Sequence, residues 1–390
     1  MKRSQRIATV PPYLFAEIDK KKAAAIASGV DIISLGIGDH DNPTFPNIVK
    51  KMQQAVADPA NHDYPPYEGT KEFRTAASVF YKKRFGVEID PAKNVLALIG
   101  SKEGIAHSFL AFTDPGDIVL IPDPAYPVYA IWAKFVGAVP YYMTLEPQNG
   151  FIPDLKKIPA DVVKKAAMLW INYPNNPTGA VASIEFYKEV VAFCKKHNIL
   201  LCSDLSYSEL AFEGYKPPSI FEVPGAMDVA IEFYSLSKGF NMTGWRSAFA
   251  VGNEEVIKAF SIIKTNTDSG IFKAIQSASV EALLNSEKYC AEQNDKLISK
   301  RRDALVNGLN SLGWKITSPK ATFYIWAPVP KGFTSLQFCA EVLEKCGIII
   351  VPGNGYGAAG EGYFRAAVTV SEKRIKEAVL RMKKAGIHYS

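Results

Sequence analysis

The chain of 390 residues has few of the patterns that mark secreted or membrane proteins. Its five cysteines are scattered, odd in number and without a CxxC pair, which favours buried thiols in a reducing compartment over a disulfide framework. No apolar run approaches the ~18 residues of a membrane span. The basic N-terminal segment MKRSQRIATVPPYLF has no continuous apolar stretch and is therefore not a secretory signal. We expect a cytoplasmic protein without membrane partners.

Charge of one sign is also scarce. Lys and Arg number 45 against 39 Asp and Glu, a formal net charge of +6, and the longest basic block is Lys20-Lys21-Lys22. Nucleic-acid-binding domains carry denser basic patches, so no nucleic-acid partner is expected. Charged residues make up 22% and hydrophobic residues 48% of the chain, a balance typical of a globular protein with a large core.

Several catalytic motifs are missing as well. The five histidines form no HExxH or other metal-binding spacing, so no metal site is expected, and the GxSxG motif of many hydrolases is absent. The glycine-rich segment PGNGYGAAGEG at 352–362 does not have the GxGxxG order and precedes a predicted strand instead of a helix. We interpret it as a loop and not as a dinucleotide site.

What the sequence does contain is a regular alternation of short apolar runs and amphipathic stretches. Several runs are almost continuously apolar, which is typical of strands buried on both faces of a parallel sheet. Their alternation with helices favours a doubly wound α/β layer. The predicted strands span 31–36, 94–100, 117–124, 166–174, 199–204, 229–237 and 247–253, and the predicted helices span 101–112, 127–135, 184–197 and 254–263.

The two ends of the chain differ from this middle part. They are predicted to form a helix at 11–28, a long charged helical stretch from about 285 to 312, strands near 323–328, 347–351 and 362–370, and a closing helix at 371–384. We therefore predict a large domain over residues 46–284 and a smaller α/β domain assembled from residues 1–45 and 285–390.

Polar residues follow five of the predicted strands. In open α/β sheets, ligands bind beyond the carboxyl ends of the strands, so these residues are expected to share one site. In chain order the segments are Gly100–Gly104 at a helix start, Asp123–Pro127 with Tyr126, Asn172–Gly179 with Asn176, Ser203–Tyr207 with Asp204, and Ser235–Lys238. Each segment alone is a weak signal, but together they describe one site.

The segment SLSKGFNMTGWR at 235–246 places one lysine after two serines, with an arginine eight residues later. Together with the polar segments above, it supplies the set of groups that a bound pyridoxal 5′-phosphate requires: a lysine, a carboxylate, an amide, a tyrosine and an anion-binding site. The aldehyde of this cofactor needs a lysine, its ring nitrogen a carboxylate, its phenolic oxygen neutral donors, and its phosphate a helix start, hydroxyls and an arginine. The sequence therefore predicts a pyridoxal phosphate site.

These motifs resemble those of the class I and II aminotransferases, a family of pyridoxal-phosphate-dependent enzymes of fold type I, over nearly the whole chain. The resemblance implies a mostly parallel seven-stranded sheet between helices in the large domain. It also implies catalytic roles for Lys238, Asp204 and Tyr126. Lys238 would bond covalently to the cofactor and shuttle the proton, with Asp204 at the ring nitrogen, Tyr126 over the ring, and Asn176 and Tyr207 at the phenolic oxygen.

The phosphate and the substrate have their own residue sets in this family. By resemblance, the phosphate would be held by Ser101, Lys102, Ser235, Ser237 and Arg246. Tyr64 of YPPYEG would reach the phosphate in the neighbouring subunit of a homodimer. Arg365 of GYFRAAV would bind the α-carboxylate of an amino acid or 2-oxo acid substrate, beside Gly38 of LGIGD and Asn176.

Several segments, among them PPYLFAEIDKK, SLGIGD, DPAYPVY and KTNTDSG, resemble most closely the LL-diaminopimelate aminotransferases of this family. That group transfers an amino group between LL-2,6-diaminopimelate and 2-oxoglutarate, by ping-pong chemistry, in lysine and peptidoglycan synthesis. The resemblance makes Tyr13 a substrate-contacting residue. Where better-studied members have glutamate in a YxxEQG turn, this chain has Tyr67 followed by Glu68, so these two are further candidates for the far end of the substrate.

Other interpretations of the same residues exist. An alanine- or aspartate-type aminotransferase would use the same cofactor set, as would a β-lyase or a decarboxylase, although Arg365 argues against decarboxylation because that reaction needs a free carboxylate. A cofactor-binding regulator usually carries an appended DNA-binding module, for which this chain is not expected to have room. For single residues the alternative is a structural role, such as a solvated helix position for Lys102, an ion pair for Arg365, and packing for Tyr126, Tyr64 and Tyr13.

Overall fold

The computed structural model describes residues 2–8, 10, 20, 23, 27 and 29–389. The helix predicted for 11–28 lies outside the described residues apart from single positions, and Tyr13 lies outside them altogether. All five cysteines are buried thiols, as predicted. Within the described part of the chain, every helix is too short or too polar to cross a membrane.

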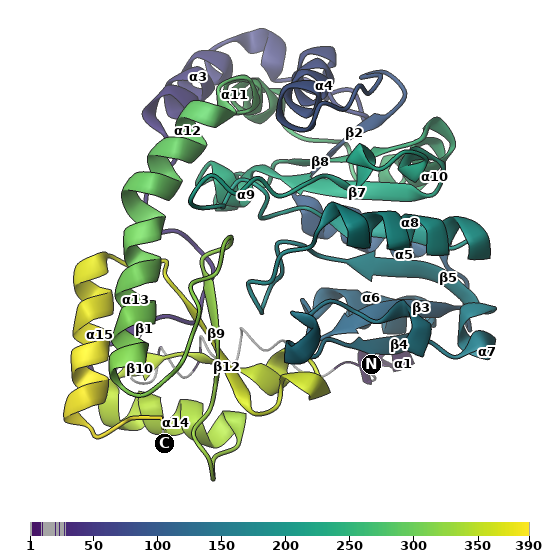
Figure 1. The fold of residues 1–390 in the computed structure, drawn as a ribbon. Helices are drawn as coiled ribbons and strands as arrows, with labels where there is room; N and C mark the ends of the chain where they lie inside the picture. The colour runs from purple at the N-terminus through teal and green to yellow at the C-terminus, as the bar shows by residue number, and fades with distance from the viewer. Residues whose placement is uncertain are drawn as a thin grey trace.

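The centre of the fold is a seven-stranded sheet in the order β2-β8-β7-β6-β5-β3-β4 (Figure 1). Strand β8 runs antiparallel to its neighbours β2 and β7, and the remaining pairs are parallel. The strands are β2 (Val95–Leu98), β3 (Ile118–Asp123), β4 (Val139–Thr144), β5 (Ala166–Ile171), β6 (Leu200–Asp204), β7 (Ala230–Ser235) and β8 (Ala248–Gly252). The sheet confirms the predicted α/β layer.

Strand β4 is the one member of this sheet outside the sequence predictions. It lies at the sheet edge beside β3, and Met143 is the only buried residue among its six. Its sequence VPYYMT contains Pro140, which is unfavourable inside a strand and is tolerated at a sheet edge, so the run does not have the usual pattern of a central strand.

Helices cover both faces of the sheet (Figure 1). Phe109, Tyr129 and Phe260, from α5, α6 and α10, share one hydrophobic cluster with strand residues. Helices α4, α8 and α11 belong to a second cluster. The helices of this part of the chain are α3 (Pro46–Val56), α4 (Lys71–Phe85), α5 (Ser101–Phe112), α6 (Val128–Val136), α7 (Ala160–Val163), α8 (Ile184–His197), α9 (Leu236–Gly239), α10 (Glu254–Thr265) and α11 (Lys273–Leu284), and α1 (Gln5–Ala8) contacts α6.

Local sequence explains why the best predicted helix starts and stops where it does. At the start of α8 the Ser183 side chain caps the helix by accepting a hydrogen bond from the Phe186 N–H at 3.3 Å. At its end, Asn198 adopts a left-handed conformation, with φ of 54°. Asparagine tolerates that conformation better than most residues, so the helix ends there.

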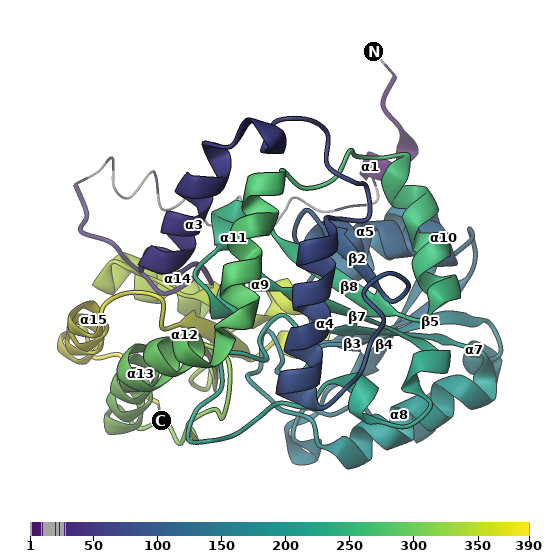
Figure 2. The same ribbon diagram turned by 90° about the horizontal axis from the view of Figure 1, so that it is seen from above.

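The rest of the chain forms a second body with its own hydrophobic core (Figures 1 and 2). Its two small sheets pair β1 with β10 and order β11-β12-β9. Helix α12 (Ser286–Gln293), whose Tyr289 and Cys290 belong to the core of the large body, leads into it through a π-helical turn (Asn294–Ile298). The elements of the second body are β1 (Ile33–Ser34), α13 (Ser299–Ser311), β9 (Tyr324–Pro328), α14 (Ser335–Cys346), β10 (Ile348–Ile349), β11 (Val351–Pro352), β12 (Tyr363–Ala367) and α15 (Glu372–Lys384).

The predicted domain limits at residues 45 and 285 stay a prediction. The second core does contain residues from both predicted pieces of the small domain. Tyr207, Leu210 and Phe212 also belong to it, although they lie within the segment predicted as the large domain. The hydrophobic core of the second body therefore includes side chains from the segment that follows β6 of the large sheet, beginning with Tyr207.

Candidate active site

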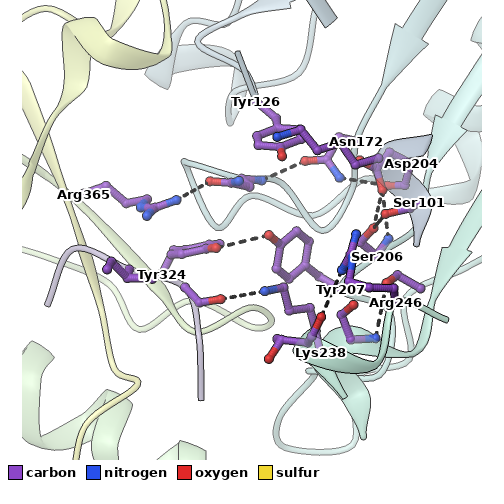
Figure 3. A pocket seen from close by; sticks show the side chains of 17 residues that line it. Ser101, Tyr126, Asn172, Asp204, Ser206, Tyr207, Lys238, Arg246, Tyr324 and Arg365 are labelled. Carbon is purple, nitrogen blue, oxygen red and sulfur yellow. Dashed lines mark hydrogen bonds between the residues drawn. The ribbon is translucent and has the colours of Figure 1, made fainter. Parts of the chain in front are cut away.

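One cavity of about 310 Å³ opens at the carboxyl ends of the parallel strands, between the two bodies (Figure 3). Parallel strands meet at this edge of the sheet, which explains why polar residues from separate segments converge there. Twelve of the residues predicted from the sequence line it: Gly38, Ser101, Lys102, Tyr126, Asn176, Asp204, Tyr207, Ser235, Ser237, Lys238, Arg246 and Arg365.

Asp204 lies at the end of β6 and is buried. Its carboxylate accepts hydrogen bonds from the Tyr129 hydroxyl at 2.7 Å and from the Ser206 hydroxyl at 2.6 Å. Burial raises the pKa of the Asp204 carboxyl, while these two hydrogen bonds act in the opposite direction. A cationic group in the cavity would further stabilise the ionised form, because a buried charge is costly without a partner.

Lys238 lies in the short helix α9, directly after β7. Its amine donates a hydrogen bond to the Gly38 carbonyl at 2.6 Å. Burial lowers the pKa of this amine to about 8, with smaller contributions in the same direction from Arg365 and Arg246, and the Asp39 carboxylate acts to raise it. A lysine with a pKa near 8 is partly unprotonated near neutral pH, so it can act as a nucleophile or a base.

The backbone of Lys238 is held from outside α9. Its carbonyl oxygen accepts a hydrogen bond from Gln293 Nε2 at 3.0 Å, and His40 Nε2 lies at the same distance. These contacts leave the lysine side chain as the part of the residue that can move within the cavity.

A cradle for an anion lies at the start of α5 and around α9. Ser101, Ser235, Ser237 and Arg246 face the cavity here, and Arg246 is held by a hydrogen bond from its Nη1 to the Thr243 carbonyl at 2.9 Å. Gly100 precedes α5 with φ of 78°, and a Cβ there would lie 2.2 Å from Arg246 Nη2. A glycine is therefore required for the arginine to approach the helix start, where backbone N–H groups favour anions.

Arg365 enters the cavity from β12, on the opposite side from this cradle (Figure 3). Its guanidinium donates to Asn176 Oδ1 at 2.8 Å and to the Gly36 carbonyl at 2.6 Å. It also lies over the ring of Tyr324, 4.0 Å from the centroid, and 4.9 Å from that of Tyr356. These hydrogen bonds and aromatic rings fix its position at the cavity wall, and a guanidinium held in this way is suited to bind an anionic substrate group.

Tyr207 and Tyr324 form part of the cavity wall between the anion cradle and Arg365. Their hydroxyl groups lie 3.1 Å apart and their rings meet edge to face. The Tyr324 hydroxyl also approaches Gly38 so closely that a Cβ at residue 38 would lie 2.1 Å from it. This contact explains the glycine at position 38, whose carbonyl holds the Lys238 amine.

Five further residues line the cavity without having been singled out by the sequence analysis: Ile37, Asn172, Ser206, Thr243 and Tyr324. Asn172, Ser206 and Thr243 lie within the sequence motifs described above. Their position next to predicted site residues is the sequence signal by which they could have been identified. Asn172 donates to the Asp204 carbonyl at 2.8 Å, and its own Oδ1 accepts from the Asn176 N–H at 2.9 Å. Tyr324 has no such signal, because only the packing of β9 against the large body brings it here.

Three predicted residues do not line the cavity. Tyr64 and Tyr67 have 83% and 46% of their surface exposed, and Glu68 lies next to Tyr67 on the same loop. This loop is nevertheless held firmly, since the Glu68 carbonyl accepts from the Ala97 N–H at 3.0 Å and the Thr70 N–H donates to Gln276 at 2.7 Å. Exposed tyrosines on a fixed loop are suited to contact a second molecule.

The residues present fit pyridoxal 5′-phosphate. A buried carboxylate would face its ring nitrogen, a lysine of lowered pKa its aldehyde, and a helix start with serine hydroxyls and an arginine its phosphate. Gly100 keeps that helix start open, because a Cβ at this position would collide with Arg246. The three groups come from different strand ends, so one ligand with all three complementary parts explains their meeting in one cavity.

The comparisons with known proteins agree with this chemistry. A family model described as aminotransferase class I and II matches residues 30–382. The chain belongs to this family. The LL-diaminopimelate aminotransferase 2 of Trichormus variabilis is 54% identical to it over 391 residues, and the LL-diaminopimelate aminotransferase of Gloeobacter violaceus is 54% identical over 392, each with 100% of both chains covered. The substrate-bound structure of BacF from Bacillus subtilis is 36% identical, with a TM-score of 0.96 over 98% of each chain.

This aminotransferase therefore has the fold type I architecture of pyridoxal-phosphate-dependent enzymes and uses pyridoxal 5′-phosphate as its cofactor. The predicted family, fold class and cofactor are confirmed. The roles assigned to individual side chains stay predictions, and their convergence on one cavity is what supports them.

Proposed function

We propose that this aminotransferase moves an amino group between LL-2,6-diaminopimelate and 2-oxoglutarate. The observation that carries the proposal is full-length identity of 54% with enzymes named LL-diaminopimelate aminotransferase, together with a cavity that both Lys238 and Arg365 line. The reaction belongs to lysine and peptidoglycan synthesis, which fits the cytoplasmic location that the five buried thiols suggest.

When bound, pyridoxal 5′-phosphate supplies an aldehyde that captures amines and an electron-poor ring that stabilises negative charge on the neighbouring carbon. Asp204 holds the proton on the ring nitrogen by charge, in a site where burial strengthens electrostatic interactions. Tyr126 covers one face of the cavity. Tyr129 and Ser206 keep the Asp204 carboxylate oriented through their hydrogen bonds.

Arg365 positions the substrate. A guanidinium forms two parallel hydrogen bonds with a carboxylate, and this geometry fixes the orientation of the α-carbon relative to Lys238. Lys238 then takes the proton from that α-carbon through its Nζ, for which its lowered pKa is suited. Binding of the carboxylate by Arg365 also disfavours its loss, so amino transfer is favoured over decarboxylation.

We also propose that the enzyme is a homodimer. Tyr64, Tyr67 and Glu68 lie on a well-held, exposed loop and outside the cavity of their own chain. They can meet the phosphate or the far end of diaminopimelate only from a neighbouring copy. In a dimer, Tyr64 can contact the phosphate bound by the neighbouring subunit, as the family resemblance implies. Tyr67 and Glu68 can contact the far end of the substrate bound there.

The test is a panel of amino donors assayed with 2-oxoglutarate and the purified, cofactor-loaded protein. LL-diaminopimelate should give the highest kcat/KM, against meso-diaminopimelate, aspartate, alanine and aromatic amino acids, with glutamate as the product. A Lys238→Ala variant is the control and should be inactive with every donor. Turnover of alanine or aspartate with inert LL-diaminopimelate would overturn the proposed substrate and leave only the family assignment.

A further inference from the structure

Lys264, at the end of α10, is a buried cation next to the cofactor site. Its side chain has 0% of its surface exposed. The amine lies 3.3 Å from a Glu103 carboxylate oxygen and donates to both Asp268 oxygens, at 2.9 and 3.0 Å. Lys264 thus joins a carboxylate on α5 to one in the segment that follows α10.

Metal binding does not explain this group. Glu103, His107 and Asp268 offer ligand atoms within 4.8 Å of one another. The Lys264 amine is hydrogen-bonded to both of these carboxylates, so an ammonium group already supplies the positive charge that a metal ion would bring. The cluster is a buried ion network, and such networks are costly because the charges lose their hydration.

The Glu103 side of the network leads to the anion cradle. Glu103 lies in the first turn of α5, two residues after Ser101. Its Oε2 accepts a hydrogen bond from the Ile99 N–H at 2.5 Å, so it fixes the turn that comes before Gly100. Glu103 therefore sets the position of the helix start that presents Ser101 and Lys102 to the cavity.

The Asp268 side leads to the exposed loop. Asp268 accepts a hydrogen bond from the Gly270 N–H at 2.7 Å. Gly270 packs on this loop so closely that a Cβ there would lie 3.1 Å from Pro65 and 3.3 Å from the Pro66 carbonyl. Figure 2 shows α10 beside α5, so one lysine at the end of α10 supports both the helix start and the loop that carries Tyr64.

We propose that Lys264 is a positioning residue for the phosphate group of the cofactor. It acts through Glu103 on the start of α5 and through Asp268 on the loop before α4. The inference rests on the proposed placement of the phosphate at the start of α5. Loss of the Lys264 charge leaves two carboxylates facing each other in a buried place, and their repulsion shifts the elements that hold the phosphate.

The experiment compares the affinity of the apoprotein for pyridoxal 5′-phosphate and for pyridoxal, which has no phosphate. Lys264→Met removes the shared cation, and the nearly isosteric Asp268→Asn loses the charged contact that ties Lys264 to the segment before α11. Each should lower the affinity for pyridoxal phosphate by about tenfold, which is ~1.4 kcal/mol. The affinity for pyridoxal should stay within about twofold. Binding is followed by absorbance and by equilibrium dialysis, and kcat at saturating pyridoxal phosphate should change little.

Lys258→Met is the matched control, since Lys258 lies on the same helix but in an exposed ion pair with Glu254. It should bind both ligands as the wild type does. Equal losses for pyridoxal and its phosphate, or no loss for Lys264→Met and Asp268→Asn, would overturn the proposal. If Lys264→Met does not fold, Asp268→Asn carries the test. A wild-type apoprotein that binds pyridoxal as tightly as pyridoxal phosphate would overturn the phosphate placement itself.

Discussion

The two ends of the active-site cavity are built from different kinds of chain segment. The cofactor end consists of residues at the end of β6, in α9 after β7 and at the start of α5, such as Asp204, Lys238 and Ser101. The substrate end depends on Arg365 from β12 and Tyr324 from β9, which belong to the other body. The cofactor end is thus a property of one sheet edge, whereas the substrate end exists only where two bodies meet.

This difference predicts that the two ends can be damaged separately. Changes at the substrate end should alter substrate binding and spare the cofactor, and changes at the cofactor end should do the opposite. Three substitutions test the separation, and two of them have a control on a neighbouring residue.

The largest effect is expected for Arg365→Lys. The ammonium keeps the charge but loses the two-pronged geometry, and each charged hydrogen bond contributes about 1.5–3 kcal/mol. kcat/KM for the amino donor should fall about 10- to 100-fold, mainly through KM, as measured by steady-state kinetics. The affinity for pyridoxal 5′-phosphate should be unchanged. An equal loss of cofactor affinity would show that the two ends are not separate.

A smaller effect is expected for Tyr64→Phe, which removes only a hydroxyl group. If this hydroxyl donates to the phosphate in the neighbouring subunit, the loss of about 0.5–1.5 kcal/mol should weaken cofactor binding roughly two- to tenfold. Tyr67→Phe on the same loop is the control and should bind the cofactor normally. Sedimentation analysis should find a dimer in all three proteins. A monomeric wild type with full activity would contradict the proposed role of the loop.

The smallest effect is expected for Asp39→Asn, as a shift in pH dependence. The Lys238 amine has a pKa of about 8, so its reactive neutral form increases as the pH rises through 8. The Asp39 carboxylate stabilises the protonated form, so its removal should lower the pKa of Lys238 and move the pH profile to lower pH. The rate at which the apoprotein captures pyridoxal between pH 6 and about 10 measures this shift.

Asp41→Asn is the control for that experiment. Asp41 lies two residues further along the same segment and pairs with Arg301 at 2.7 Å. Its removal should leave the pH profile of cofactor capture in place. A shift to higher pH in Asp39→Asn would contradict the electrostatic account of the Lys238 pKa.

The sequence was most informative where structure depends on neighbours along the chain. The helices at 101–112 and 184–197 end at the predicted residues, because capping and apolar periodicity are local signals. The predicted strands 94–100, 117–124 and 199–204 each contain a strand of the central sheet. Helices α3, α4, α11 and α14, by contrast, are absent from the predictions, as is the exposed edge strand β4.

The order of motifs along the chain was enough to predict the cofactor chemistry of this protein. The start of the anion cradle, a carboxylate and a lysine come at the ends of β2, β6 and β7, and parallel strands end at one edge of the sheet, so the order of strands and motifs predicts their meeting. The packing of the two bodies, by contrast, places Tyr324 against Arg365 and leaves Tyr64 and Tyr67 exposed and outside the lining of the cavity in their own chain. Those contacts depend on how two hydrophobic cores pack against each other, which is set by the shapes of whole surfaces and leaves no periodic pattern in the sequence.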